Sequence, residues 1–210
     1  MAAGRRLALL ALARRHGLLV IEDDYDHEFH YDGRPVLPLA SADEAGVVAS
    51  IGTLSKVLAP GLRLGFVVAP TALAERMVRL RAVMDRQGDH PMEATIAELI
   101  EEGELQRHVR KMRGVYLARR DFLVRRLEAS LGHVLSWKVP SGGISIWAKV
   151  TKPLDVQHWL ARALARGVSV LSGAQYTFSG NEPGALRLVF ARFNEVELGR
   201  AVEVLASTVP

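Results

Sequence analysis

Lys56 has the neighbours that covalent chemistry on an aldehyde requires. It lies in the run Ser50 to Phe66, among hydroxyls, glycines, a proline and a following arginine. A lysine whose amine is partly neutral forms a Schiff base with an aldehyde. The hydroxyls of Thr53 and Ser55 and the guanidinium of Arg63 are suitable ligands for a phosphate dianion. This stretch therefore predicts a binding site for a phosphorylated aldehyde.

A second group of reactive side chains lies upstream, at the end of an expected strand. The stretch Leu18 to Asp26 begins with apolar residues and ends in acidic residues and a tyrosine. Another apolar strand, Val47 to Gly52, ends just before Thr53 and Lys56. Since ligands of open α/β sheets gather at the carboxyl ends of the strands, we expect acid and amine to face one crevice. Pyridoxal phosphate needs an amine for its aldehyde, a carboxylate for its ring nitrogen and ligands for its phosphate.

The motifs resemble those of a known family. Ile21 to Asp26, Gly52 to Lys56 and Leu62 to Gly65 look like fold-type I aminotransferases, and most like the aminotransferase-like domain of MocR-type regulators in the GntR superfamily. Pro140 to Trp147 and Gly184 to Phe190 are similar to the small domain of that family. The resemblance covers nearly the whole chain, and its motifs are specific in combination.

The resemblance implies catalytic and cofactor roles at the two strand ends. It implies Lys56 as the Schiff-base lysine, Asp23 as the partner of the pyridinium nitrogen and Tyr25 as the donor to the phenolic oxygen of the cofactor. From the residues alone, Asp24 could exchange roles with Asp23, because strand alternation sends adjacent side chains to opposite faces. Only the family pattern favours Asp23.

Phosphate and substrate ligands follow from the same resemblance. Thr53 and Arg63 match the phosphate ligands of the family, and Ser55 is a further hydroxyl in the same loop. Arg187 matches the arginine that holds the substrate α-carboxylate as a bidentate fork. A strand arginine paired with a carboxylate is the structural alternative for Arg187. Ser145 stands in a run like a nucleophile elbow, but Trp147 replaces the second glycine, so we expect Ser145 to be structural.

Two functions from different classes fit these residues. In an aminotransferase, Lys56 exchanges its imine for the substrate amine and then moves the Cα proton, and an amino acid and a keto acid are the small-molecule partners. In a MocR-type transcription regulator, the same fold senses an effector without net turnover. A third reading is a non-catalytic fragment.

The family also places a long segment before the position where this sequence begins. That segment carries an aromatic ring that stacks on the pyridine, and the regulators add a winged-helix DNA-binding domain still further upstream. We therefore expect this chain to correspond to the C-terminal half of a transaminase-like unit, without direct DNA contact of its own. The resemblance further implies a homodimer.

The order of apolar stretches predicts an α/β fold in two parts. We expect residues 1–104 to form part of a cofactor-binding large domain with a mostly parallel sheet. Residues 105–210 should supply a long connecting helix and an α+β small domain. The expected elements are a helix that ends at Gly17, strands 18–21, 47–52 and 64–69, helices 72–86, 92–101 and 105–131, strands 134–139 and 144–150, helix 154–165, strands 168–171 and 185–190, and helix 195–206.

Composition narrows the class of protein. The 210 residues include 27 Lys and Arg against 23 Asp and Glu, a net charge of +4, with 49% apolar residues and no cysteine. Disulfide scaffolds and cysteine-based sites are thereby excluded. No apolar run reaches the roughly 18 residues of a membrane span, so we expect a cytoplasmic protein that does not enter the membrane. His27 and His30 lie near acidic residues, but without a further ligand cluster we expect no metal.

Overall fold

A computed structural model of the chain describes residues 1, 3–33, 37–177 and 184–210. These residues form two compact units. The first comprises residues 1–30 and 37–110, and the second comprises Tyr31–Gly33 and Lys111–Pro210. The domain boundary expected at residue 104 stays a prediction. Within the described residues, no helix is both long enough and apolar enough to cross a membrane.

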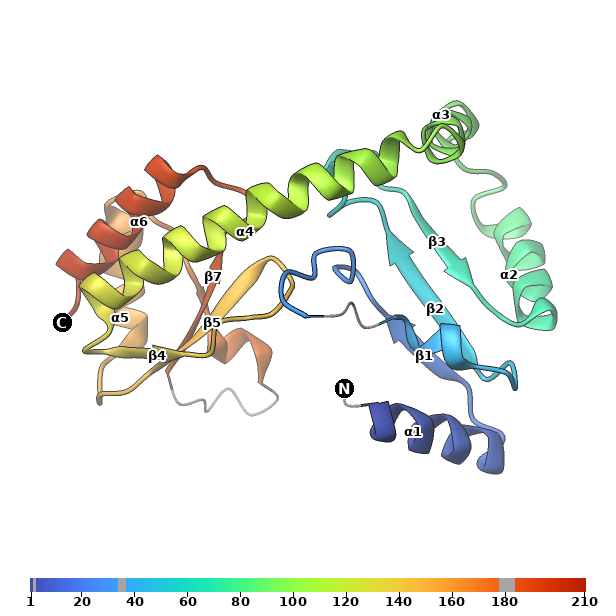
Figure 1. Ribbon diagram of the computed structural model, residues 1–210, viewed down its shortest axis with the longest axis horizontal. Coiled ribbons are helices and arrows are strands. Elements are labelled where there is room, and N and C mark those ends of the chain that lie inside the picture. The colour runs from blue at the N-terminus through green and yellow to red at the C-terminus, as the bar shows by residue number, and fades with distance from the viewer. Residues whose placement is uncertain (2, 34–36, 178–183) are drawn as a thin grey trace. The chain divides into compact units, whose positions relative to one another are not determined.

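The first unit is built on a three-stranded sheet in the order β1-β2-β3 (Figure 1). β1 (Val20–Asp23) runs parallel to β2 (Val48–Thr53), and β3 (Gly65–Val68) runs antiparallel to β2. The described part of the sheet, expected to be mostly parallel, thus has one pair of each kind. A parallel crossover needs about a dozen residues or more, usually with a helix, whereas β2 and β3 are joined only by a turn and the short 3-10 helix η2 (Pro60–Leu62).

The helix expected before β1 is present and ends at the expected glycine. α1 (Ala3–His16) is followed by Gly17 at φ 61°, and the Leu18 amide donates to the carbonyl of Ala13 at 2.9 Å. A glycine in the left-handed region satisfies carbonyls at a helix end without a Cβ clash. Leu10 of α1 packs with Leu39 and Val48 in the small core of this unit; Leu39 belongs to the 3-10 helix η1 (Leu39–Ala42).

Two further helices follow the sheet, where the sequence predicts them. They are α2 (Thr71–Met84) and α3 (His90–Glu101). The Asp89 side chain caps α3 by accepting from the Met92 amide at 3.1 Å. α3 buries one residue, Ile96, whereas α2 buries none. The first unit thus presents much of its apolar surface to solvent.

One long helix, α4 (Glu104–Leu131), confirms the helix expected over 105–131. Its first turns belong to the first unit and the remainder to the second. The second unit has a four-stranded antiparallel sheet in the order β4-β5-β7-β6. The remaining elements are β4 (Leu135–Trp137), β5 (Ser145–Val150), α5 (Val156–Ala165), β6 (Leu171–Ser172), the 3-10 helix η3 (Gly173–Tyr176), β7 (Ala185–Val189) and α6 (Glu195–Ser207).

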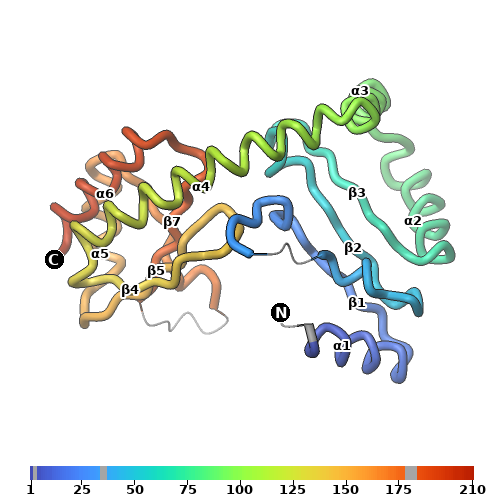
Figure 2. Tube along the Cα trace, in the orientation of Figure 1, coloured from blue at the N-terminus to red at the C-terminus, as the bar shows by residue number. Residues whose placement is uncertain are grey.

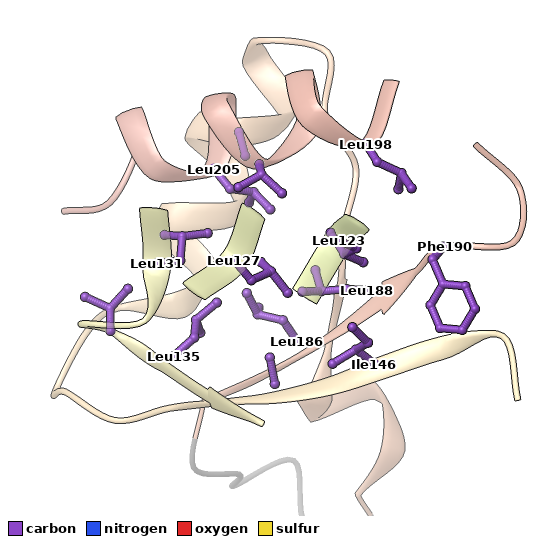
Figure 3. Packing of buried hydrophobic residues seen from close by; sticks show 14 of the residues in the cluster. Leu123, Leu127, Leu131, Leu135, Ile146, Leu186, Leu188, Phe190, Leu198 and Leu205 are labelled. Carbon is purple, nitrogen blue, oxygen red and sulfur yellow. The ribbon is translucent and has the colours of Figure 1, made fainter. Parts of the chain in front are cut away.

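The core of the second unit lies on one face of this sheet (Figure 3). Ile146 of β5 and Leu186 and Leu188 of β7 face it, and α4, α5 and α6 cover it with leucines, valines and the buried Trp159. Since side chains alternate along a strand, the residues between them, among them Arg187, point to the opposite face. An antiparallel sheet with helices on one face is the α+β arrangement that the sequence predicts for the small domain.

Several elements begin two or more residues from the expected position, and two of these differences have a clear local cause. In place of the strand expected over 168–171, β6 covers only Leu171–Ser172, because the Val168 amide donates to the carbonyl of Ala163 at 3.0 Å and so completes the end of α5. α5 begins at Val156 rather than residue 154, because the Asp155 side chain accepts from the His158 amide and caps the helix there.

Candidate functional site

β1 and β2 end at the same edge of the first sheet. Asp23 lies directly opposite Ile51, and Thr53 is two residues further along β2. Residues opposite one another in neighbouring strands face the same side, and so do residues two apart. Asp23 and Thr53 therefore project from one face at the carboxyl edge of the sheet. Among the described residues, exposed Asp23 has no hydrogen-bonding or ionic partner.

Of the two neighbouring carboxylates, Glu22 is engaged on the other face and Asp24 lies beyond the strand near a histidine. Glu22 points to the other face, where its two oxygens accept from the amides of Leu39 at 2.5 Å and Ala40 at 3.1 Å. Glu22 therefore anchors the start of η1. Asp24 lies past the strand, and its Oδ1 is 3.8 Å from Nδ1 of His27. Of the three acids at the end of β1, only Asp23 both faces the side of Thr53 and is unpaired in the described structure.

Tyr25 lies two residues beyond Asp23, in the bend that follows the strand. Its side chain is 39% exposed, and the described residues give it no hydrogen-bonding partner. The phenol is thus available at the same end of the sheet, where the resemblance implies a donor.

The chain leaves β2 and returns as β3 (Figure 2). Lys56 lies in the turn that follows β2 in this connection. The Ser55 amide donates to Oγ1 of Thr53 at 3.1 Å, and the Leu58 amide donates to the carbonyl of Leu54 at 2.8 Å. Leu54 and Val57 are buried and hold the turn against the unit, while the Lys56 side chain is exposed. The turn therefore presents the amine outward from a fixed backbone.

His108 holds the same turn from the start of α4. Its Nε2 lies 3.1 Å from the carbonyl oxygen of Val57, the residue after Lys56. The sequence reasoning missed this contact, because nothing in the spacing of residues 57 and 108 indicates that they meet.

Arg63 lies across from the Lys56 turn. The antiparallel pairing of Thr53 with Gly65 continues through a hydrogen bond from the Leu54 amide to the Leu64 carbonyl at 3.0 Å. This register places Arg63 opposite Ser55. Arg63 has left-handed backbone angles, φ 52° and ψ 29°, which are uncommon for a residue with a Cβ and recur at functional sites. Its exposed guanidinium has no ionic partner in the described residues.

Arg187 lies in the second unit, on the sheet face opposite the core. Its Nε donates to Oγ of Ser145 at 3.2 Å, and one terminal nitrogen donates to the hydroxyl of Tyr176 at 3.0 Å. No carboxylate pairs with it in the part of the chain that the structure describes, so the ion-pair alternative for Arg187 finds no support there. Ser145, expected to be structural, is a hydrogen-bond partner of the candidate substrate ligand.

Two aromatic rings border Arg187. Trp147 is its cross-strand partner, and the rings of Trp147 and Tyr176 meet edge to face with centroids 5.6 Å apart. The guanidinium carbon lies 5.9 Å from the Tyr176 ring centroid. Neighbouring rings and hydroxyls restrict the directions in which the guanidinium can present its donors.

The structure thus brings together Asp23, Thr53, Ser55, Lys56 and Arg63 at one end of the first unit and places Arg187 in the second unit. Their chemical roles stay predictions. In the described ranges, no group of three or more histidine, aspartate or glutamate side chains has a metal-ligand arrangement.

Solved aminotransferases share this fold. A multiple substrate aminotransferase from Thermococcus profundus superposes with a TM-score of 0.90 at 31% identity, over 100% of this chain and 52% of its own. A kynurenine aminotransferase from Pyrococcus horikoshii, solved with PMP and kynurenine, gives 0.90 at 29% identity, over 99% of this chain and 52% of its own. The fold is therefore that of part of an aminotransferase.

Curated relatives fall into two groups, enzymes and regulators. Aromatic-amino-acid aminotransferase 1 of Thermococcus litoralis is 30% identical over 98% of this chain and 49% of its own length. The probable rhizopine catabolism regulatory protein MocR of Rhizobium meliloti is 34% identical over 86% of this chain and 37% of its own length. The chain spans half or less of the length of these relatives. Residues 6–205 match the family model for aminotransferase class I and II, and the chain belongs to that family.

Proposed function

We propose that this chain is the part of a pyridoxal-phosphate-dependent aminotransferase that binds the cofactor through Lys56 and the substrate carboxylate through Arg187. One observation carries the proposal. Asp23, unpaired in the described structure, shares a sheet face with Thr53 directly before the turn of Lys56. An unpaired carboxylate, a hydroxyl and an amine at the carboxyl edge of one sheet are the functional groups that this cofactor needs.

The residues of the first unit fit the cofactor in charge and in kind. Bound there, the cofactor supplies a ring that withdraws electrons from the substrate Cα. Asp23 would hold the ring nitrogen in its protonated form, and Tyr25 would donate to the phenolic oxygen. Lys56 would bind the aldehyde carbon, and its free amine would accept the Cα proton and return it.

Phosphate and substrate are held by different units of the chain. The guanidinium of Arg63 and the hydroxyls of Thr53 and Ser55 bind the phosphate as charged and neutral donors. Arg187 binds the α-carboxylate of an amino acid, because a planar guanidinium matches the two carboxylate oxygens. A homodimer, a keto-acid acceptor and a cytoplasmic location belong to this proposal as predictions.

The test is covalent capture of the cofactor by the purified chain. Pyridoxal phosphate is added, the visible spectrum is recorded, and borohydride is used to fix the attachment before peptide mass analysis. We expect an absorbance band that is lost in Lys56→Ala and kept in Lys152→Ala, a matched change at an exposed lysine. Attachment to many lysines, or an equal band in Lys56→Ala, would refute the proposal for this chain.

The regulator relatives favour a second candidate function. In a MocR-type regulator, the same residues bind cofactor and amino acid as an effector site without net turnover. The similarity to MocR of Rhizobium meliloti supports this alternative. Keto-acid release measured with the cofactor, an amino acid and a keto-acid acceptor separates the two. Repeated turnovers per chain indicate the enzyme, whereas saturable binding with at most one turnover indicates the sensor.

A further inference from the structure

Tyr31 and Asp32 lie early in the sequence, yet they pack in the second unit. The amides of both residues donate to the Ser141 carbonyl, at 2.8 Å from Tyr31 and 3.2 Å from Asp32. The Tyr31 hydroxyl donates to the Gly143 carbonyl at 2.6 Å. These bonds fasten a short segment of the chain to the loop Pro140 to Gly143.

Arg120 of α4 is at the centre of this contact. It is 5% exposed, and one terminal nitrogen donates both to Oδ2 of Asp32 at 2.5 Å and to the Pro140 carbonyl at 2.8 Å. Its Nε donates to Asp121 at 2.8 Å, and its guanidinium carbon lies 5.2 Å from the Tyr31 ring centroid. Burial alone would lower the pKa of Arg120, but hydrogen bonds to Asp32 and Asp121 outweigh it and raise the pKa, so Arg120 stays charged.

The loop held in this way leads directly to the candidate carboxylate site. Gly143 has a φ of 84°, which a residue with a Cβ rarely adopts, and β5 begins two residues later at Ser145. Ser145 accepts from Nε of Arg187. A series of contacts therefore runs from Arg120 and Tyr31, through the loop, to the guanidinium of Arg187.

We propose that Tyr31, Asp32 and Arg120 are positioning residues for Arg187: they fix the loop Pro140 to Gly143 and thereby set the direction of the Arg187 guanidinium. The proposal deepens the proposed function and rests on it, since it assigns a purpose to the orientation of Arg187. It also links the segment that follows the cofactor residues Asp23 and Tyr25 to the site of the substrate carboxylate.

The physical reason is the directionality of the bonds. A hydrogen bond weakens steeply when its angle falls, and two parallel bonds to a carboxylate require the guanidinium plane to be aligned. Two loop carbonyls, those of Ser141 and Gly143, are held by the segment, and that of Pro140 is held by Arg120. Because the Ser145 backbone is also paired with Val189 of β7, the expected effect of releasing one restraint is a small shift of the loop and of the Ser145 side chain, which weakens the bond from Nε of Arg187.

Tyr31→Phe is the sharpest variant. It removes the hydroxyl that donates to Gly143 but keeps the ring that packs on Arg120 and lies 6.3 Å from Phe190, centroid to centroid. The readout is the Nε–H resonance of Arg187 in a proton–nitrogen spectrum, assigned by its loss in Arg187→Gln. Propionate, a simple carboxylate, is the binding probe, so the measurement needs neither cofactor nor turnover.

We expect Tyr31→Phe to shift the Arg187 resonance and to weaken propionate binding by about fivefold, the scale of one hydrogen bond. Asp32→Asn, a change at an exposed carboxylate, should act in the same direction. The matched control is Arg126→Gln, which removes an exposed ion pair of α4 with Glu203 and should change neither readout. An unmoved resonance in both Tyr31→Phe and Asp32→Asn would overturn the inference.

The carboxylate-binding role of Arg187 and the positioning role of Tyr31 are refuted by different results. If Arg187→Gln leaves propionate binding unchanged, Arg187 does not bind carboxylates and the proposed function is wrong at this residue. The resonance of Arg187 in Tyr31→Phe still decides whether the segment positions it. If all variants, Arg126→Gln included, shift the resonance equally, the effect is general destabilisation and the positioning role is refuted.

Discussion

At the residue scale, adjacent acids have different surroundings although their chemistry is the same. Glu22 holds two backbone amides of η1, Asp24 lies near His27, and Asp23 is unpaired in the described structure. From the residues alone, either Asp23 or Asp24 could serve the cofactor, and only the family resemblance favoured Asp23. The register of β1 against β2 supports Asp23, since it shares a face with Thr53.

This difference predicts unequal effects of two matched substitutions. Asp23→Asn removes the charge that keeps the cofactor ring nitrogen protonated, and we expect cofactor affinity to fall by about tenfold or more, as for loss of a charge-assisted bond. Asp24→Asn should change cofactor affinity by less than about twofold, because Asp24 loses only a long, partly buried contact with His27. Titration with pyridoxal phosphate at the visible band measures both, and the reverse order would assign the role to Asp24.

At two positions of the family motifs, Gly52 and Gly65, a side chain would collide with a neighbouring atom, which the spacing of the motifs does not reveal. A Cβ on Gly65 would lie 2.8 Å from the carbonyl oxygen of Gly52, a backbone atom held in the sheet. A Cβ on Gly52 would lie 2.2 Å from the tip of the Phe66 ring, which is half exposed and can turn away. The fixed neighbour makes the substitution at Gly65 the more costly one.

Gly65→Ala is therefore expected to destabilise the first unit by about 1–3 kcal/mol, the usual cost of overpacking. Gly52→Ala should cost less. Amide hydrogen exchange of β2 and β3 as denaturant rises measures the free energy of opening for each variant. A larger loss in Gly52→Ala would show that Phe66 cannot move and would contradict the steric argument.

At the scale of elements, local signals predicted the helices well and the sheet less well. Gly17 ends α1 and Asp89 caps α3, both by interactions between residues close in sequence. The direction of β3 and the short β6 depend on pairing between distant residues. Segment Tyr31–Gly33 packs in the second unit for the same reason, through bonds to a loop more than a hundred residues later.

The turn of Lys56 shows how one element holds another. His108 of α4 bonds the Val57 carbonyl, and the turn has few other restraints besides its buried Leu54 and Val57. His108→Ala should speed hydrogen exchange of the Leu58 amide, because local opening of the turn becomes easier. His133→Ala, at an exposed histidine of the second unit, is the control and should leave that amide unchanged. Equal exchange in all forms would show that the two buried side chains suffice.

The last helix offers a second test at this scale. Asn194 caps α6 by accepting from the Glu197 amide at 3.0 Å, and the Glu197 side chain accepts from the Asn194 amide at 2.8 Å. Asn194→Ala removes the bond in which the Asn194 side chain accepts, and it should lower the free energy of unfolding by about 1 kcal/mol. Denaturant unfolding followed by circular dichroism measures the loss. Asn194→Asp should restore most of it, since an aspartate also caps and suits the positive end of the helix.

At the scale of the whole molecule, the two units differ in how much apolar surface they bury. The core of the second unit draws on three helices and three strands, whereas that of the first is a small cluster around Leu10, Leu39 and Val48. Val67 of β3 and Val83 of α2 are 41% and 84% exposed. Because burial of apolar surface is the main stabilising term, the second unit should be the more stable one.

Substitution of one core leucine in each unit tests whether the units unfold independently. Leu127 of α4 is fully buried, and Leu127→Ala should lower the free energy of unfolding of the second unit by about 2–5 kcal/mol. The free energy of opening at the slowest-exchanging amides of β5 and β7 should fall by the same amount. Amides of β2 should not change, because their opening involves only the first unit. Leu10→Ala should lower protection of the β2 amides and leave those of β5 and β7 unchanged. Added pyridoxal phosphate should protect only the unit that carries Lys56, since a ligand stabilises the state it binds. Parallel loss of protection in β2 and β7 in either variant would show instead that the two units unfold as one cooperative structure.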